Sequence, residues 1–279
     1  MSSLPTFPIT FSACGERRVV VAGATGRMGR LLIQATHESP GCTLTGALAG
    51  TNALGQDAGN ALGFVSGVKV TSDFSVGLSN ADVLIDFTRP EVTMENLAAC
   101  HARGIQLVIG TTGFDEAQKE AIKNASNHIA IVMSPNMSTG VNVTFKLVEL
   151  AARILRDDFD IEIFEAHHRG KVDAPSGTAL KMGEVIAGAL ARDFDECAVY
   201  SRTGITGERD AQSIGFSSLR GGDIAGDHTV FFAGAGERIE ITHRSSGRSA
   251  FAQGSLRAVK FLADKRSGLF DMFDVLDLR

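Results

Sequence analysis

The chain has 279 residues, of which 44% are hydrophobic and 21% are charged, and it contains no tryptophan. Since domains average about 100–200 residues, the chain is long enough for two domains, and its composition is that of a globular protein. The net charge of −5 offers no basic face for a phosphate backbone, and no run approaches the ~18 apolar residues of a membrane span, so neither nucleic acid nor a membrane is an expected partner.

The first part of the chain alternates short apolar runs with amphipathic ones. Strands are expected at residues 18–23, 42–50, 81–88, 105–113 and 128–136, and helices at residues 26–38, 91–103 and 115–127. The strands are apolar throughout, which favours a parallel sheet covered on both faces. We therefore expect an α/β fold with a Rossmann-like, doubly wound parallel sheet.

The pattern changes after residue 136. Helices are expected at residues 137–156, 178–192 and 249–265, and strands at residues 159–168, 211–220 and 228–244, the last forming a hairpin around residues 234–236. This arrangement predicts a second, α+β domain with a mixed sheet.

The four cysteines are scattered and form no C-x-x-C pair. This spacing fits neither a zinc knuckle nor a disulfide framework, so we expect reduced thiols and a cytoplasmic protein. No metal is expected either, because the adjacent His167 and His168 lack a helical i, i+4 partner and a nearby cysteine ligand. The opening "MSSLPTFPITFSACGERR" resembles a lipoprotein cleavage site faintly, but it has two prolines and no basic residue before its apolar part. We interpret residues 1–17 as an N-terminal extension.

A glycine-rich turn joins the first strand to the first helix. "VVVAGATGRMG" places Gly23, Gly26 and Gly29 where a dinucleotide fold needs a tight turn, a close approach to the pyrophosphate and close helix packing. The pyrophosphate is then expected at the start of the helix, where free N–H groups favour negative charge. The spacing is G-x-x-G-x-x-G, which is a weak signal by itself and gains its weight from the strand before it and the helix after it.

Two later segments also follow strand ends. "IGTTG" (residues 109–113) and "SPNMSTG" (residues 134–140) supply small and hydroxyl-bearing residues at the edge where doubly wound sheets bind ligands. Ordinary turn chemistry explains either segment equally well.

The stretch "IEIFEAHHRGKVDAPSGTA" combines two histidines with a lysine before a helix start. His167 and His168 point to opposite faces of a strand, so they can share a pocket only if the strand ends there. Histidine is a natural proton donor near neutral pH, and Lys171 is a fixed charge for a carboxylate. The alternative is a solvated polar loop. His228 and His243 are interpreted as hairpin histidines without a catalytic role, although either could line a cleft.

Six segments together resemble the dihydrodipicolinate reductase family: "AGATGRMG", "IDFTRPE", "VIGTTGF", "SPNMSTGVN", "EAHHRGKVDAPSGTA" and "SGLFDMFDVL". The resemblance runs from about residue 18 to the C-terminus. It implies NAD(P)H-dependent reduction of 4-hydroxy-tetrahydrodipicolinate to tetrahydrodipicolinate, in lysine and diaminopimelate biosynthesis. It also implies a homotetramer, and a dinucleotide domain of residues 18–136 and 248–279 beside a substrate and oligomerisation domain of residues 137–247.

The resemblance assigns roles position by position. His167 matches the proton donor and Lys171 the second catalytic residue, while the substrate contacts match His168, Gly177 and Thr178. The cofactor-binding residues that it implies are Gly23, Ala24, Thr25, Gly26, Arg27, Met28, Gly110, Thr111, Thr112, Ser134, Pro135, Asn136 and Met137.

The choice of cofactor departs from a common pattern. Where a fold that favours NADH usually offers an acid to the ribose, the end of the second strand has Ala49 and Gly50. Arg27, Thr51 and Asn52 remain as partners for a 2′-phosphate, so we expect NADPH to serve at least as well as NADH. The alternatives are a two-domain dehydrogenase of a small amino acid, of aspartate or homoserine type, and a protein that senses NAD(P)H without turnover.

Overall fold

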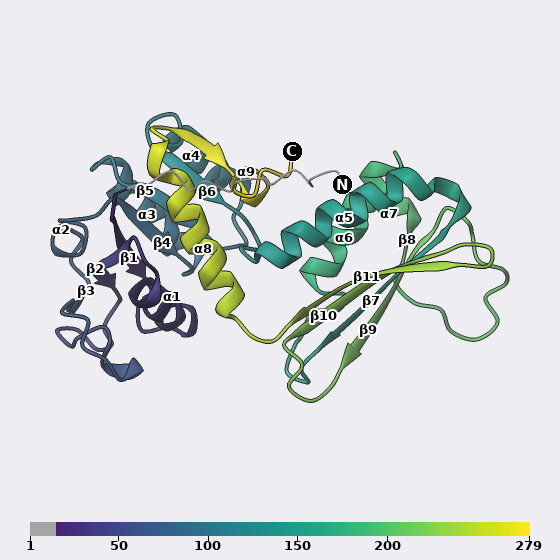
Figure 1. The fold of residues 1–279 in the computed structure, drawn as a ribbon, viewed down its shortest axis with the longest axis horizontal. Coiled ribbons are helices and arrows are strands. Elements are labelled where there is room, and N and C mark those ends of the chain that lie inside the picture. Colours follow the sequence, from purple (N-terminus) through teal and green to yellow (C-terminus); the bar gives the residue numbers. More distant parts are fainter. Residues whose placement is uncertain (1–14) are drawn as a thin grey trace, which may run out of the picture. The chain divides into compact units, whose positions relative to one another are not determined.

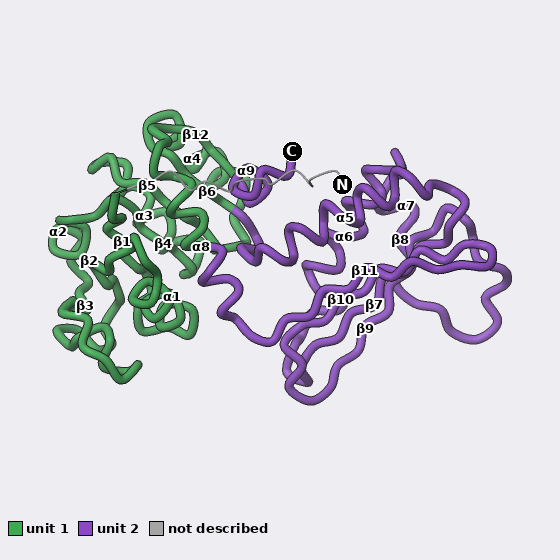
Figure 2. Tube along the Cα trace, viewed as in Figure 1, with its two compact units in different colours: residues 1–133, 255–270 green, residues 134–254, 271–279 purple. Residues whose placement is uncertain are grey.

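The computed structural model describes residues 15–279, which divide into two compact units (Figure 2). Unit 1 contains the chain up to residue 133 together with residues 255–270, and unit 2 contains residues 134–254 and 271–279. Of the expected N-terminal extension, residues 1–14 lie outside the described part. Arg17 already belongs to the first strand, because its N–H donates to the carbonyl of Gly41.

Unit 1 is built on a seven-stranded sheet, of which Figure 1 labels strands β1 to β6. The strand order is β12-β6-β5-β4-β1-β2-β3, and every pairing is parallel. Its strands are β1 (Arg17–Ala22), β2 (Cys42–Leu48), β3 (Val70–Thr71), β4 (Val83–Asp86), β5 (Gln106–Ile109), β6 (Ala130–Met133) and β12 (Gly268–Phe270). The expected doubly wound parallel sheet is therefore confirmed.

Helices separate these strands along the chain. They are α1 (Arg27–Glu38), α2 (Phe74–Gly77), α3 (Pro90–His101), α4 (Glu116–Ala125) and, from Ser255 onward, α8 (Ser249–Phe261), with short 3-10 turns at Asn60–Leu62 and Leu262–Asp264. Val19, Val20 and Val21 point alternately to the two faces of the sheet, yet all three are fully buried. Helices therefore cover both faces, which explains why the strands are apolar throughout.

Unit 2 contains a mixed five-stranded sheet in the order β11-β10-β7-β9-β8. Its strands are β7 (Asp160–His167), β8 (Ala198–Val199), β9 (Ile214–Arg220), β10 (Gly226–Ala233) and β11 (Arg238–Ser245). The hairpin β10–β11 and the pair β10–β7 are antiparallel, whereas β7–β9 and β8–β9 are parallel. The expected second domain with a mixed sheet is confirmed.

Two long helices lie over one face of this sheet (Figure 1). The helices of unit 2 are α5 (Thr139–Leu155), α6 (Gly177–Ala189), α7 (Phe194–Cys197) and α9 (Met272–Val275), with a 3-10 turn at Arg156–Asp158. Val148 of α5 and Ile186 of α6 pack against Ile161, Ile163 and Phe232 of the sheet, and these side chains are at most 1% exposed. This core fixes the strand from which the histidine segment emerges.

The C-terminal segment is divided differently from the expected domains. Residues 248–254 and 271–279 belong to unit 2, whereas the family resemblance implies that the whole of 248–279 belongs to the dinucleotide domain. The physical reason is local packing, since α9 contacts α5 and Phe273 packs against the core of unit 2.

Candidate functional site

A cavity of about 450 Å³ opens in unit 2 where β7, β10 and β11 meet the start of α6. Basic groups dominate it, with Asp223 as the one carboxylate among the lining residues. The residues that line it are Asn136, Ser138, Val141, His167, His168, Lys171, Thr178, Asp223, Ala225, Gly226, His228, His243, Ser245, Gly247, Arg248 and Phe251. Such a lining suits a small anionic ligand.

The histidine segment enters this cavity because β7 ends there. His167 is the last residue of β7, and the N–H of Lys171 donates to the carbonyl of His168 at 3.0 Å, which closes a turn. Both histidines therefore line one cavity, as the sequence allowed only for a strand that ends at this point. The alternative of a freely solvated loop does not describe His167, which is 8% exposed.

His167 is held by a buried carboxylate. Its Nδ1 lies 2.5 Å from Oε2 of Glu165, which is only 1% exposed. Arg220 donates to both oxygens of this carboxylate, at 2.8 and 2.7 Å, and the N–H of Ser176 donates at 3.2 Å. Burial by itself raises the pKa of Glu165, but hydrogen bonds from Arg220, Ser218 and His167 outweigh it and lower the pKa to about 2. Glu165 is therefore a carboxylate at physiological pH.

Lys171 lies in the same cavity and is paired with a neighbour. Its Nζ donates to both oxygens of Asp173, at 2.8 and 2.9 Å. The hydrogen bond from Lys171 is the main reason that the pKa of Asp173 is lowered. Because Asp173 is about half exposed, this pairing is weak enough for a ligand carboxylate to replace it.

The start of α6 faces the cavity through Thr178. Ser176 caps the helix, since its Oγ accepts the N–H of Ala179 at 3.2 Å. The N–H groups of Gly177 and Thr178 belong to the first turn, where an α-helix offers no internal acceptor. Asn136 donates to Oγ1 of Thr178 at 3.3 Å, so one of the expected cofactor residues and one of the expected substrate residues lie together. Gly177 is not a lining residue, although it opens the same helix.

The opposite wall of the cavity contains the two hairpin histidines, which the sequence allowed to line a cleft but to which it gave no role. His228 and His243 face each other across the hairpin β10–β11 and both line the cavity, together with Arg248. Burial first, and then the nearby His167, lower the pKa of His228 to about 4, so its ring is neutral. The hairpin was predicted, but its register was not, and only the register places these histidines on the same face.

The glycine loop of unit 1 has the geometry of a close turn. Gly23 has φ +67°, and its carbonyl accepts the N–H of Gly26 at 2.9 Å. A Cβ at Gly29 would lie 2.1 Å from the carbonyl oxygen of Gly23, so only glycine allows α1 to start this close to β1. Gly26 is the N-cap of α1 and makes no side-chain cap, so the first amides of the helix are open to an anion.

The remaining expected cofactor residues lie in two loops. In unit 1, Thr111 is buried and its Oγ1 lies 3.3 Å from Asp86, whereas Thr112 is exposed. In unit 2, Ser134 is buried and donates to the carbonyl of Asn136 at 2.9 Å, and the side chain of Met137 is fully buried. These contacts fix the two loops. Thr112 is exposed, whereas Thr111, Ser134 and Met137 are buried.

Close packing against an aromatic ring requires glycine at position 110. A Cβ at this position would lie 2.3 Å from the ring of Phe87.

Among residues 15–279, no cluster of three or more histidine, cysteine or acidic side chains is arranged to hold a metal ion. Within the same residues, no helix combines the length and the apolar character that crossing a membrane requires.

The chain matches two family descriptions over almost its whole described length. Residues 17–137 match "Dihydrodipicolinate reductase, N-terminus", and residues 140–276 match "Dihydrodipicolinate reductase, C-terminus". The chain is 58% identical over 266 residues to the 4-hydroxy-tetrahydrodipicolinate reductase of Chromobacterium violaceum, which covers 95% of this chain and 100% of that protein. It is 60% identical over 264 residues to that of Cupriavidus metallidurans, which covers 94% of this chain and 100% of that protein.

Solved structures show the same fold. The dipicolinate-bound dihydrodipicolinate reductase from Paenisporosarcina sp. TG-14 aligns with a TM-score of 0.75 at 24% identity, over 93% of this chain and 98% of that chain. GenD2 from gentamicin A biosynthesis, in complex with NAD, aligns with a TM-score of 0.59 at 13% identity, over 96% of this chain and 92% of that chain. The two family matches and the relatives at about 60% identity, together with the parallel sheet and the histidine-lined cavity, show that this chain belongs to the dihydrodipicolinate reductase family.

Proposed function

We propose that the protein reduces 4-hydroxy-tetrahydrodipicolinate to tetrahydrodipicolinate with NADPH or NADH, in lysine and diaminopimelate biosynthesis. In this reaction the substrate ring gains a hydride and a proton, the cofactor is oxidised and water leaves. The observation that carries the proposal is the cavity in which His167, His168, Lys171 and Thr178 meet, in a chain of this family.

The cavity suits a cyclic dicarboxylate. Lys171 and the amides of Gly177 and Thr178 offer donors to a carboxylate, and His168 adds a further donor beside them. The structure from Paenisporosarcina sp. TG-14 has dipicolinate bound, which is a planar dicarboxylate of the same class. We assign these groups to holding the substrate ring in place, which is orientation rather than chemistry.

The cofactor is assigned to the loops at the carboxyl ends of the parallel strands. Gly23 to Met28 would hold the pyrophosphate at the start of α1, where the close turn described above leaves room for it. Gly110 to Thr112 and Ser134 to Met137 would contact the nicotinamide half. When bound, the reduced nicotinamide supplies the hydride.

His167 is assigned as the proton donor. It is 8% exposed, lines the cavity through its ring and is hydrogen-bonded on Nδ1 to Glu165, which leaves Nε2 as the nitrogen for the substrate. Lys171, which lines the same cavity, is assigned to holding a substrate carboxylate so that the ring lies next to this proton donor.

We also propose a homotetramer in the cytoplasm. In unit 2, α5 and α6 cover one face of the mixed sheet, while the other face carries Leu219 of β9, which is 42% exposed, and the half-buried Phe164 and Phe231. Apolar side chains on an uncovered sheet face support association through this sheet. Cys42, Cys100 and Cys197 are buried and unpaired, which supports a reducing compartment.

The test is a turnover assay with purified protein, reduced cofactor and freshly prepared 4-hydroxy-tetrahydrodipicolinate, followed by the absorbance of the reduced nicotinamide. Loss of absorbance that depends on this substrate supports the proposal. Turnover only with aspartate semialdehyde would support the small amino acid dehydrogenase, and cofactor binding without turnover of either substrate would support a sensor.

A further inference from the structure

The face of β7 that packs on the helices changes character along the strand. Every second residue of β7 points to this face, namely Ile161, Ile163, Glu165 and His167. The two isoleucines belong to the core of unit 2. The next two inward positions, Glu165 and His167, are also buried but polar. A carboxylate in such a position costs free energy unless it is fully paired.

Glu165 is fully paired, and Arg220 is its main partner. Arg220 lies opposite His167 in the parallel pairing of β7 and β9, and its two terminal nitrogens donate to the two oxygens of Glu165. Nη2 of Arg220 also donates to the carbonyl of Asp173 at 2.5 Å. The guanidinium therefore ties the carboxylate to the loop that carries Lys171.

This pairing decides which nitrogen of His167 faces the substrate. A carboxylate that accepts two hydrogen bonds from an arginine is ionised, so it can only accept a hydrogen from Nδ1 of His167. Nε2 is left for the cavity. Gly226 keeps it accessible, because a Cβ at that position would lie 3.0 Å from Nε2.

We propose that Glu165, fixed by Arg220, is a positioning residue that holds His167 with its hydrogen on Nδ1 and its Nε2 directed at the substrate. The proposal rests on the proposed function, in which His167 is the proton donor. When His167 gives the proton of Nε2 to the reduced ring, it becomes the neutral tautomer that Glu165 already binds. It can then take a new proton from water on Nε2 without turning its ring.

Stability alone does not account for this arrangement. Replacing a buried ion pair by well-packed apolar residues is often neutral or stabilising, and the neighbouring inward positions are isoleucines. A fully paired carboxylate therefore need not add stability over an apolar residue at this position, and it lies directly beside the ring that the reaction uses.

The decisive variant is Glu165→Gln. Its amide can either accept from or donate to Nδ1, so it no longer dictates the tautomer. We expect kcat to fall about 10- to 100-fold with KM changed less than about threefold, since part of a general-acid contribution of about 10²–10⁴ is lost. Nitrogen-15 NMR of the histidine rings, without substrate, should show the Nδ1–H form of His167 in the wild type and a mixture of tautomers in the variant.

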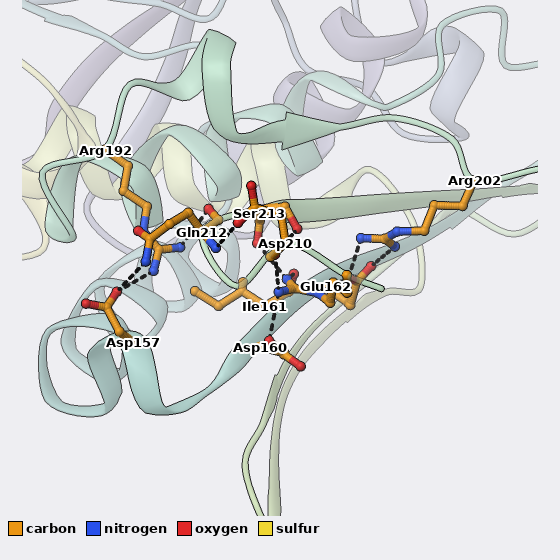
Figure 3. A network of polar contacts seen from close by, with 10 residues as sticks. Asp157, Asp160, Ile161, Glu162, Arg192, Arg202, Asp210, Gln212 and Ser213 are labelled. Carbon is orange, nitrogen blue, oxygen red and sulfur yellow. Dashed lines mark hydrogen bonds and ion pairs between the residues drawn. The ribbon is translucent and has the colours of Figure 1, made fainter. Parts of the chain in front are cut away.

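Glu162→Gln is the matched control. Glu162 lies three residues earlier on β7 and points to the other face, where Arg202 donates to both of its oxygens at 2.9 Å (Figure 3). Nε of Arg209 also donates to Glu162, at 3.1 Å. The substitution breaks a comparable carboxylate–arginine network that does not touch His167. It should leave kcat and the His167 spectrum unchanged.

Further variants separate the two proposals. Glu165→Asp keeps the charge and should recover part of the lost kcat, and Glu165→Gln combined with His167→Gln should be no slower than His167→Gln alone. If His167→Gln keeps the wild-type kcat, the proton-donor role is wrong. If that variant is slow while Glu165→Gln keeps wild-type kcat and tautomer, only the positioning role of Glu165 is wrong.

Arg220→Lys gives an independent test if Glu165→Gln does not fold. A lysine is a point donor and cannot hold both carboxylate oxygens in a fixed plane. We expect a folded Arg220→Lys protein to lose kcat about threefold or more at an unchanged KM. A wild-type kcat in this variant would contradict the proposal.

Discussion

The imidazole rings of His167 and His228 meet edge-on, with 5.1 Å between their centroids and 75° between their planes. His228 lies on β10 directly opposite Glu165 of β7, and its Nε2 is 3.0 Å from Oγ of Ser176. The strand pairing therefore places a second, neutral histidine against the first. Burial is the main reason that the pKa of His228 is lowered to about 4, and the nearby His167 and Lys171 lower it further.

This histidine makes stability depend on pH. The pKa of His228 is about 4 in the folded protein and about 6.5 in the unfolded chain, so between these values the unfolded chain binds more protons. Neutral His228 makes its full contribution to the free energy of unfolding above pH about 6.5. This contribution is lost as the pH falls towards about 4, and its upper limit is about 3 kcal/mol. We expect His228→Leu to flatten the curve of unfolding free energy against pH in this window. Parallel curves for both proteins, from urea titrations at several pH values, would contradict the assignment.

His167→Gln should lower kcat by about 100-fold or more, because general acid catalysis typically contributes about 10²–10⁴ and acts in the transition state. KM should change little. Steady-state kinetics over a range of substrate concentrations gives both constants. A wild-type kcat would remove His167 from the proton-donor role.

Lys171→Ala should raise the KM for substrate and also lower kcat, since a charged contact to a carboxylate acts in the ground state and in the transition state. Lys181→Ala is the control, because Lys181 is an exposed lysine of α6 whose Nζ donates to Glu184 at 3.0 Å. The control should leave both constants unchanged. If Lys171→Ala changed only the affinity for the cofactor, Lys171 would not be a substrate ligand.

The sequence predicted the architecture better than the walls of the site. Buried strands such as Val19–Val21 and the turn at Gly23 follow from local patterns, so the parallel sheet and the glycine loop could be predicted. The short strands β3 and β12 could not, because a strand of two or three residues depends on its neighbours rather than on its own composition.

The histidine segment could be predicted because its residues are close in the chain. Glu165 was not identified from the sequence. The available signal was its spacing from Ile161 and Ile163, which places a carboxylate on the core-facing side of β7. Its partner Arg220 and the histidine His228 come from other strands, and only the register of those strands brings them together.

Gly29→Ala should destabilise the protein by about 1–3 kcal/mol and impair cofactor binding, since the added Cβ would lie 2.1 Å from the carbonyl oxygen of Gly23 and 2.8 Å from Cα of Ala24. Gly188→Ala is the control, because a Cβ at this exposed position of α6 meets nothing within 4 Å. Alanine in a helix is favoured over glycine, so this control should be neutral or stabilising. Thermal unfolding and titration with NADPH measure the two effects, and equal behaviour of both variants would contradict the assigned role of the turn.

The choice between NADPH and NADH depends on the residues that follow β2. Ala49 and Gly50 occupy the place where an acid commonly binds the adenosine ribose in folds that favour NADH. Without that carboxylate there is no acceptor for the ribose hydroxyls and no repulsion of a 2′-phosphate. Arg27, exposed at the first position of α1, remains as a cation for this phosphate.

We therefore expect kcat/KM for NADPH to equal or exceed that for NADH. We also expect Arg27→Ala to weaken the binding of NADPH more than the binding of NADH. Arg266→Ala is the control, since Arg266 is an exposed arginine next to β12, at the opposite edge of the sheet from β2 and β3. This control should affect kcat/KM for NADPH and kcat/KM for NADH equally. Both cofactors must be measured at one ionic strength, because salt screens an exposed arginine–phosphate contact. A preference for NADH of more than about tenfold, which corresponds to ~1.4 kcal/mol, would show that the missing acid does not govern the choice.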